Sequence, residues 1–310
     1  MELFRKTTSI PFMAQRRAWY GVSALIILGS LILVLVRGLN FGIDFTGGVV
    51  VEAGYSGPAD LQATRQALAE AGLQSAQVQS FGTATDVLVR LPPAEGQQAM
   101  ALTEAAVAAI RSVDPGAEVR RTESIGPQVG KELAEKGATA MLMTLLFIGL
   151  YVILRFQWKF SVGAILAALH DPFLVVGFFA LTQMTFDLAV LSAILAVIGY
   201  SLNDTVVVFD RVRERLLSMR KATPAEVVDR AINETLSRTI MTSGTTLIVV
   251  LSLLFLGGEA LRGFAAALAV GIVVGTYSSI YVAGATVLDL GLSQRDLMPP
   301  EKREEADGLP

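Results

Sequence analysis

The sequence predicts an α-helical polytopic membrane protein, with six transmembrane helices and an α+β, ferredoxin-like domain inserted between the first two. Three observations predict this fold class. Of the 310 residues, 53% are hydrophobic and only 17% are charged, which favours the membrane class over a soluble globular chain. Six apolar runs reach the roughly 20 residues that cross a bilayer. Between the first two runs, the pattern changes to short alternating strands and amphipathic helices.

The six runs define the expected spans. The first is longer than the apolar region of a signal peptide, and no A-x-A-like cleavage site follows it, so we expect an uncleaved anchor. The predicted transmembrane helices cover residues 18–37, 138–155, 160–181, 187–210, 239–258 and 263–288.

Basic residues in the short loops predict the orientation, because Lys and Arg concentrate on the cytoplasmic side. The stretch 211–238 carries seven Lys or Arg residues, whereas the turn before the fourth span carries none and the turn before the sixth carries only Arg262. We therefore expect both termini, residues 1–17 and 289–310, to be cytoplasmic. The insert, residues 38–137, is then extracytoplasmic.

The cytoplasmic stretch 211–238 has a structure of its own. Thr223 and Glu226 form a capping box, and Pro224 occupies the first helical position. An apolar stripe follows. We expect a basic amphipathic helix that lies along the membrane surface before Arg238 turns into the fifth span.

The insert reads as four strands and two helices in the order β-α-β-β-α-β, which is that of a ferredoxin-like fold. It contains no His and no Cys, and its scattered carboxylates are typical of solvated faces. We therefore expect no catalytic set in the insert. The predicted strands cover residues 49–55, 76–81, 86–91 and 118–124, and the predicted helices cover 59–71 and 94–113.

Composition also limits the function. The chain has no Cys and a single His, His170, which excludes disulfides, thiol catalysis and metal sites built from Cys or from several His. The net charge of -3 is too small to indicate a nucleic-acid partner. No motif predicts catalysis, a cofactor or a metal. We therefore expect a protein that is not an enzyme.

One acidic residue falls where a charge is costly. Asp204 is expected roughly 10 Å inside the cytoplasmic boundary of the fourth span, and intramembrane acids commonly mark ion or proton pathways. Arg238, at the start of the fifth span, is the best-placed cation on another helix. The alternatives are structural: Asp204 hydrogen-bonds a neighbouring helix, and Arg238 only anchors the chain at the interface.

Other residues predict intramembrane polar support or helix packing. His170 and Asp171 lie in the third span, and Asn203 precedes Asp204. Adjacent helical residues point about 100° apart, so we do not expect His170 and Asp171 to form a dyad. In the sixth span, Gly271-x-x-x-Gly275 is typical of close helix packing.

Six motifs resemble, in the same order, those of SecF members of the SecD/SecF family of protein-export subunits, within the RND superfamily. They are FGIDFTGG at 41–48, ESIGPQVG at 123–130, HD at 170–171, YSLNDTVVVFDR at 200–211, TLSRTIMTS at 235–243 and GTYSSIY at 275–281.

The resemblance implies an RND-type half in the cell inner membrane, pairing with SecD into a twelve-helix unit. Such a pair assists SecYEG, SecA and YajC, and uses the proton motive force to draw preproteins outward. Protons are the coupling ion, and the residues matching the family's proton-transport positions are Asp204 and Arg238. Two alternatives are an RND-type exporter half for a lipid or small molecule, and a non-conducting scaffold for the translocon.

Overall fold

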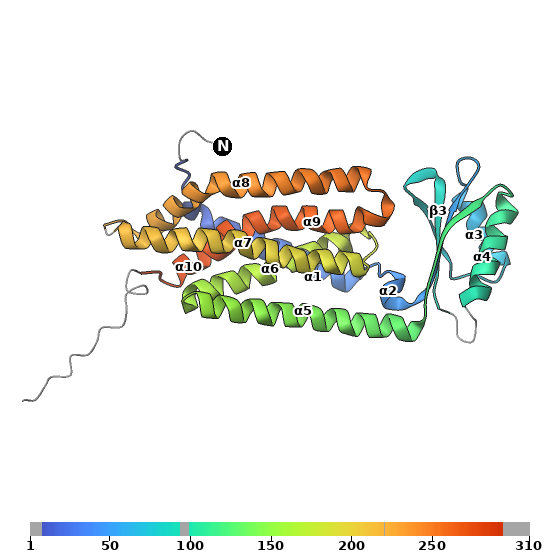
Figure 1. Cartoon of the computed structure of the whole chain (residues 1–310), viewed down its shortest axis with the longest axis horizontal. Coiled ribbons are helices and arrows are strands. Elements are labelled where there is room, and N and C mark those ends of the chain that lie inside the picture. The colour runs from blue at the N-terminus through green and yellow to red at the C-terminus, as the bar shows by residue number, and fades with distance from the viewer. Residues whose placement is uncertain (1–7, 94–98, 220, 294–310) are drawn as a thin grey trace, which may run out of the picture.

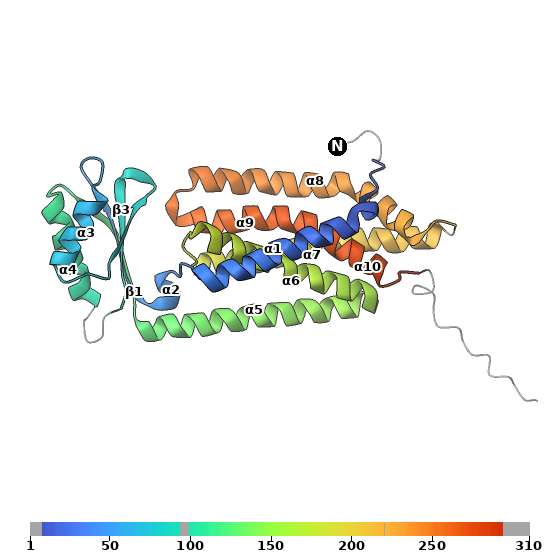
Figure 2. The same ribbon diagram turned by 180° about the vertical axis from the view of Figure 1, so that it is seen from behind.

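A computed structural model describes residues 8–93, 99–219 and 221–293 of the chain. Within these ranges, six helices are long and apolar enough to cross a membrane. A four-stranded antiparallel sheet lies between the first and second of them along the chain. Figures 1 and 2 show the sheet and its two helices at one end of the helical bundle. The predicted fold class is confirmed.

The spanning helices include one irregular segment. The last helix passes through a π-helix, η2 (Ser279–Gly284), and ends in α10 (Ala285–Asp289). A 3₁₀ turn, η1 (Phe12–Gln15), precedes the first helix, and a one-turn helix, α2 (Ile43–Thr46), follows it. The spanning helices are α1 (Arg16–Arg37), α5 (Pro127–Arg155), α6 (Trp158–Thr182), α7 (Leu188–Ser218), α8 (Pro224–Leu256) and α9 (Glu259–Ser278).

Two helices extend beyond the predicted apolar spans. α5 begins at Pro127, eleven residues before 138, because extended Gly126 and Pro at the first position start a helix that nothing then interrupts. α7 continues to Ser218, so it carries the first residues of the expected loop. Hydropathy marks the apolar part of a helix, whereas the backbone hydrogen bonds continue into polar sequence.

α8 corrects the expectation of a separate surface helix. The capping box is present: Thr223 accepts from the Glu226 amide at 3.3 Å, and Glu226 accepts from the Thr223 amide at 2.7 Å. The helix then runs without a break through Arg238, so the expected turn there is wrong. Val227 and Ile232, in the expected apolar stripe, are buried.

The sheet and its helices form the α/β domain (residues 48–125). Its strand order, β2-β3-β1-β4, with every neighbouring pair antiparallel, is the ferredoxin-like arrangement. The predicted helix 94–113 begins among residues outside the described ranges. The elements are β1 (Gly48–Gly54), α3 (Leu61–Glu70), β2 (Gln77–Phe81), β3 (Thr83–Leu91), α4 (Ala99–Val113) and β4 (Glu118–Ile125).

The two faces of the sheet differ in polarity. One face packs against α3 and α4 and buries Val51 and Val89, together with Leu68 and Ile110 from the helices. The opposite face carries charged residues and lies toward the membrane helices (Figure 2). Alternation along the strands thus separates an apolar core from a polar surface that faces the bundle.

α7 lies within the bundle and packs against α6, α8 and α9, while α1 packs against α6. Edge-to-face aromatic contacts join Phe160 and Phe156 to Phe209 of α7. The outer faces of α1, α5 and α8 expose large apolar side chains such as Leu35, Phe147 and Phe255. These faces suit lipid or a partner helix.

Candidate functional site

Buried polar side chains gather in two groups inside the bundle. We call the first the Asp204 cluster and the second the Asp171 cluster. The Asp204 cluster consists of Tyr200, Asp204, Ser243 and Thr276, from α7, α8 and α9. The Asp171 cluster consists of His170, Asp171, Ser201 and Ser278, from α6, α7 and α9.

Asp204 is a buried acid with few hydrogen-bond donors. Only 4% of its surface is exposed, and within the described residues its side-chain donors are the hydroxyls of Ser243, at a long 3.5 Å, and of Thr239. Ser243 also shares a 2.8 Å hydrogen bond with Thr276 and receives one of 3.5 Å from Tyr200. The cluster therefore joins three helices around a carboxylate whose hydrogen bonds come from neutral hydroxyl groups.

Arg238 lies near Asp204 but does not pair with it. Its charge acts on the carboxylate electrostatically, yet the Arg238 side chain makes no ion pair or hydrogen bond within the described ranges. The Arg238 side chain is exposed, whereas the next residue, Thr239, is buried beside the Asp204 cluster. Because neighbouring helical residues point about 100° apart, Arg238 faces out of this chain.

The Asp171 cluster corrects one expectation. His170 Nδ1 lies 2.9 Å from Asp171 Oδ1, so the two adjacent residues do form a hydrogen-bonded pair. Their Cα–Cβ bonds diverge as expected, but the imidazole is long enough to reach back to the carboxylate. Helical spacing fixes the direction in which a side chain leaves the backbone, and not where a long side chain ends.

Asp171 is completely buried and well supplied with donors. Its second oxygen, Oδ2, accepts hydrogen bonds from Ser201 of α7 and from Ser278 of α9, the latter at 3.0 Å. Together with His170, three groups therefore donate to one carboxylate. Asn203 belongs to neither cluster, because it is exposed and makes no side-chain hydrogen bond with the part of the chain that the structure describes.

Both predicted packing glycines face α7. A Cβ on Gly271 would lie 2.2 Å from Val197, and a Cβ on Gly275 would lie 2.9 Å from Ser201. These positions require the absence of a side chain. Because Gly275 admits Ser201 so closely, it also places a member of the Asp171 cluster against α9.

A second set of polar contacts joins the α/β domain to the membrane helices. Arg90 of β3 donates to Asn40 Oδ1 at 3.0 Å and the Phe41 carbonyl at 3.1 Å, and reaches Thr185 in the α6–α7 turn at 3.0 Å. Burial lowers the pKa of Arg90, while the charge of Asp187 opposes that change. Sequence reasoning missed Arg90, since its partners are up to 95 residues away along the chain.

Asp44 forms the other half of this junction. It accepts from the backbone amide of Leu188 at 3.0 Å, and so caps the first turn of α7. Two glycines with positive φ, Gly47 at 72° and Gly48 at 120°, then lead directly into β1. The resemblance flagged this segment as a motif, but residue spacing alone gave no sign that it touches α7.

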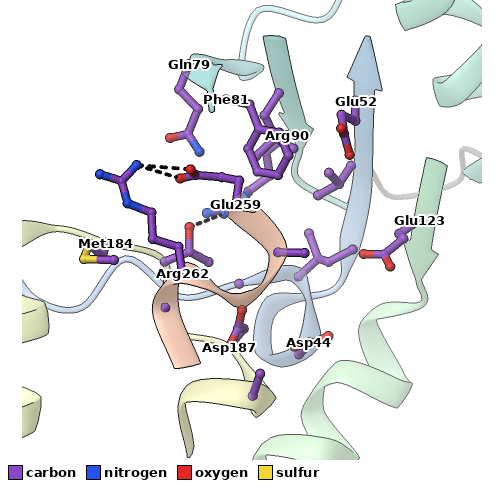
Figure 3. Close-up of a pocket in the computed structure, with 18 of the residues that line it drawn as sticks. Asp44, Glu52, Gln79, Phe81, Arg90, Glu123, Met184, Asp187, Glu259 and Arg262 are labelled. Carbon is purple, nitrogen blue, oxygen red and sulfur yellow. Dashed lines mark hydrogen bonds and ion pairs between the residues drawn. The ribbon is translucent and has the colours of Figure 1, made fainter. Parts of the chain in front are cut away.

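A cleft of about 510 Å³ lies at the junction between the α/β domain and the bundle. Figure 3 shows Glu52 and Glu123 on the sheet side and the Glu259–Arg262 ion pair at the start of α9. Its lining is mixed in charge, with several acids and three arginines: Arg90, Arg121 and Arg262. Across the described ranges, no group of three or more potential metal ligands forms.

Comparisons with known proteins place this architecture. The model "Protein export membrane protein SecD/SecF, C-terminal" matches residues 105–293, and the "SecD/SecF GG Motif" model matches residues 32–59. "Protein translocase subunit SecF" of Vibrio alginolyticus is 44% identical, over 98% of this chain and 97% of that protein. The same-named protein of Pseudomonas aeruginosa is 46% identical, over 98% and 99% respectively.

A solved structure agrees. The crystal structure of SecDF, a translocon-associated membrane protein from Thermus thermophilus, matches with a TM-score of 0.82 and 38% identity. The match covers 94% of this chain and 39% of that longer chain. On the length and identity of these matches, the chain belongs to the SecD/SecF family of protein-export membrane proteins.

Proposed function

We propose that this chain is an auxiliary subunit of the bacterial Sec translocase, which pairs with SecD and uses the proton motive force to promote preprotein export. The observation that carries the proposal is Asp204: a buried intramembrane carboxylate that is bonded by the neutral hydroxyls of Ser243 and Thr239 and makes no ion pair within the described ranges. Such an acid is costly to keep charged, so it favours a proton-binding role over a structural one.

The orientation follows from the distribution of basic residues. The α5–α6 turn and the end of α7 lie at the bundle end remote from the α/β domain, whereas the end of α1 and the start of α9 lie near that domain (Figure 1). The first group carries Arg155, Lys159 and three arginines of α7, and the second carries Arg37 and Arg262. Because Lys and Arg concentrate on the cytoplasmic side of membrane proteins, the arginine-rich end is the cytoplasmic one. Both termini are then cytoplasmic, and the α/β domain lies on the outer side of the inner membrane.

A partner is expected on the face that Arg238 presents. In this chain Arg238 is exposed, and no cation of the described ranges forms an ion pair with Asp204. SecD is the partner for this face, since the similar crystal structure is of a SecDF protein and this chain covers only part of it. The larger assembly would include SecYEG, SecA and YajC.

α7 gives a route from the proton site to the α/β domain. Asp204 and Asp187, the residue before the helix, are separated by about 25 Å at 1.5 Å per residue. At that end Asp44 caps the helix, and Arg90 binds the adjacent turn. Protonation of Asp204 would alter the packing of α7, and these contacts would carry the movement to the α/β domain.

Two other functions receive less support. An exporter of lipids would need an apolar binding cleft. The cleft between the domain and the bundle has a charged lining, but an apolar cleft of about 410 Å³ lies beside it, lined by residues that include Phe45, Met141 and Leu191, so this function keeps some support. A passive scaffold would have no need to keep Asp204 buried with no ion pair in the described part of the chain. The buried acid therefore favours the translocase role.

The test is proton-gradient-dependent export in proteoliposomes containing the complete Sec translocase with its SecD partner. We expect Asp204→Asn to remove the stimulation by the gradient while the complex still co-purifies. Asp210→Asn is the matched control, because Asp210 lies on the same helix but pairs with Arg155 at the surface. Gradient stimulation that survives in Asp204→Asn would refute the mechanism.

A further inference from the structure

The Asp171 cluster contains an unused proton acceptor. With Asp171 as a carboxylate, the hydrogen bond puts the His170 proton on Nδ1, which leaves a lone pair on Nε2. His170 is only 4% exposed, and its Nε2 has no hydrogen-bond partner among the residues that the structure describes. Buried polar atoms are nearly always paired, so an open acceptor at this depth needs an explanation.

The charge of the cluster is also uncompensated. Ser201 and Ser278 donate to Asp171 but carry no charge. Within the described ranges, the one ion pair that Asp171 makes is with His170, which carries a charge only when doubly protonated. With a neutral imidazole, the cluster therefore holds a net charge of one carboxylate among apolar helices.

Several ionisable groups of the elements packed around α6 are engaged elsewhere. Tyr277 of α9 lies beside the His170 ring, at 6.0 Å between centroids, but its hydroxyl donates to the Trp19 carbonyl and bonds Ser23 of α1. Asp204 of α7 bonds Ser243. Five further groups meet different partners: Arg16 pairs with Asp289, Arg37 bonds the Leu181 carbonyl, Arg155 pairs with Asp210, Glu132 pairs with Lys136, and Tyr281 stacks on Trp19. Arg17 of α1 and Lys131, Glu135 and Tyr151 of α5 make no side-chain hydrogen bond or ion pair within the described residues.

We propose that His170 and Asp171 form a second proton-binding site of the bundle, with the proton taken up on His170 Nε2. The inference rests on the proton-coupled function proposed above and adds a site to it. The proton adds to the Nε2 lone pair, no bond breaks, and nothing is oxidised or reduced. The product is an imidazolium paired with the Asp171 carboxylate, and the cluster becomes neutral.

The site shares its helices with the Asp204 cluster. Ser201 precedes Asp204 by three residues on α7, so both lie on one face of that helix. On α9, Ser278 follows Thr276 closely, and the π-helix η2 begins at the next residue. π-Helical segments often mark functional positions. A proton bound at one cluster therefore changes the field and the helix packing at the other.

The single His of the chain allows a direct test. The full chain is purified with a tag free of histidine, labelled with ¹⁵N-histidine and placed in lipid nanodiscs. Solid-state NMR then reports the two ring nitrogens of His170 alone over a pH series. We expect Nε2 to change from unprotonated to protonated. Asp171→Asn should lower the proton affinity of His170 roughly tenfold or more, because it removes the adjacent negative charge.

The controls separate this site from Asp204. Ser243→Ala, in the Asp204 cluster, should leave the His170 midpoint close to that of the unchanged chain. Asp204→Asn should still allow His170 to titrate. The proposal is overturned if His170 stays neutral throughout the pH range in which the chain is folded, if Asp171→Asn leaves the midpoint unchanged, or if titration disappears in Asp204→Asn. Export can lose or keep its gradient dependence in Asp204→Asn independently of these outcomes, so the two proposals fail separately.

Discussion

The α/β domain and the helical bundle bury polar groups in different ways. In the domain, Thr64 bonds Tyr55 at 2.8 Å, and Asp86 is paired with Arg120, whose own side chain is 51% exposed. In the bundle, the described side chains that bond Asp171 and Asp204 are themselves buried. A domain in water can neutralise a buried acid from its surface, whereas a membrane bundle must do so internally.

The bundle itself contains two solutions to this problem. Asp171 makes hydrogen bonds with three side chains, while Asp204 is bonded by Thr239 and, at a long 3.5 Å, by Ser243. Both oxygens of the first acid are therefore bonded, and the second acid has fewer donors. If the proposed function holds, the polar groups of the bundle bind protons, whereas those of the α/β domain fix its shape and its attachment.

The largest stability effect that we expect from a minimal change lies in the bundle, at Gly271. In Gly271→Ala, the new methyl would lie 2.2 Å from the buried and rigid Val197, and overpacking of this kind costs about 2–3 kcal/mol. The measurement is thermal unfolding of the purified full chain. Gly199→Ala on α7 is the matched control, because nothing lies within 4 Å of its Cβ position.

The control should move in the opposite direction. Alanine is favoured over glycine in a helix by about 0.5–1 kcal/mol, so Gly199→Ala should raise stability slightly. If both variants changed stability equally, the close approach of α7 and α9 would not be a tight contact. The bundle would then be as tolerant of added volume as a solvated surface.

A smaller effect is expected where the two regions meet, at Arg90. Arg90→Met removes the hydrogen bonds to Asn40, Phe41 and Thr185, at a cost of about 1.5 kcal/mol for bonds to a charged group. Hydrogen exchange should then become faster in the α6–α7 turn and around Asn40. The core of the α/β domain should keep its protection.

Arg121→Met provides the comparison for Arg90. Arg121 also lines the cleft, but it pairs with Glu123 of its own strand and does not reach the bundle. Exchange in the α6–α7 turn should be unchanged in this variant. Equal acceleration in both variants would mean that the cleft charges as a group, and not Arg90, hold the domain to the membrane helices.

Much of the architecture could be predicted from the sequence because its signals are local. Hydropathy located the six helices, and alternation located the four strands, whose order the structure closes into a ferredoxin-like sheet. Helix ends were less predictable. The start of α5 at Pro127 and the unbroken α8 depend on hydrogen bonds that continue through polar sequence.

The site residues also divide into those with a local sequence signal and those that depend on long-range contacts. Asp204 was found because a charge in an apolar run is visible without any fold, and Gly271 because small residues repeat at helical spacing. The pairing of His170 with Asp171 was missed because it depends on the reach of a long side chain. Arg90 and Asp44 were missed because their partners lie far along the chain. The sequence could not show that the Arg238 side chain points out of the bundle, because that depends on how α8 is rotated against its neighbours.

The smallest effect is expected inside the α/β domain, at Asp114. Its carboxylate accepts from the Ser56 amide at 2.6 Å and from the Gly116 amide at 2.9 Å, and these bonds hold the pKa of Asp114 below its usual value. A lowered folded-state pKa stabilises the fold above the unfolded value of about 3.9, and this stabilisation is lost as the pH falls through the folded value.

Asp114→Ala should therefore speed hydrogen exchange around Ser56 near neutral pH, relative to the unchanged chain at the same pH. The difference between the two chains should shrink in acid, where protonated Asp114 no longer accepts both bonds fully. Glu118→Ala, at an exposed position on β4, is the control and should have no such effect. A difference that persisted unchanged below the folded-state pKa would show that Asp114 acts through packing. In that case packing, and not charge, would hold the Ser56 loop of the α/β domain. The domain would then differ from the bundle, where buried charged groups are the distinguishing feature.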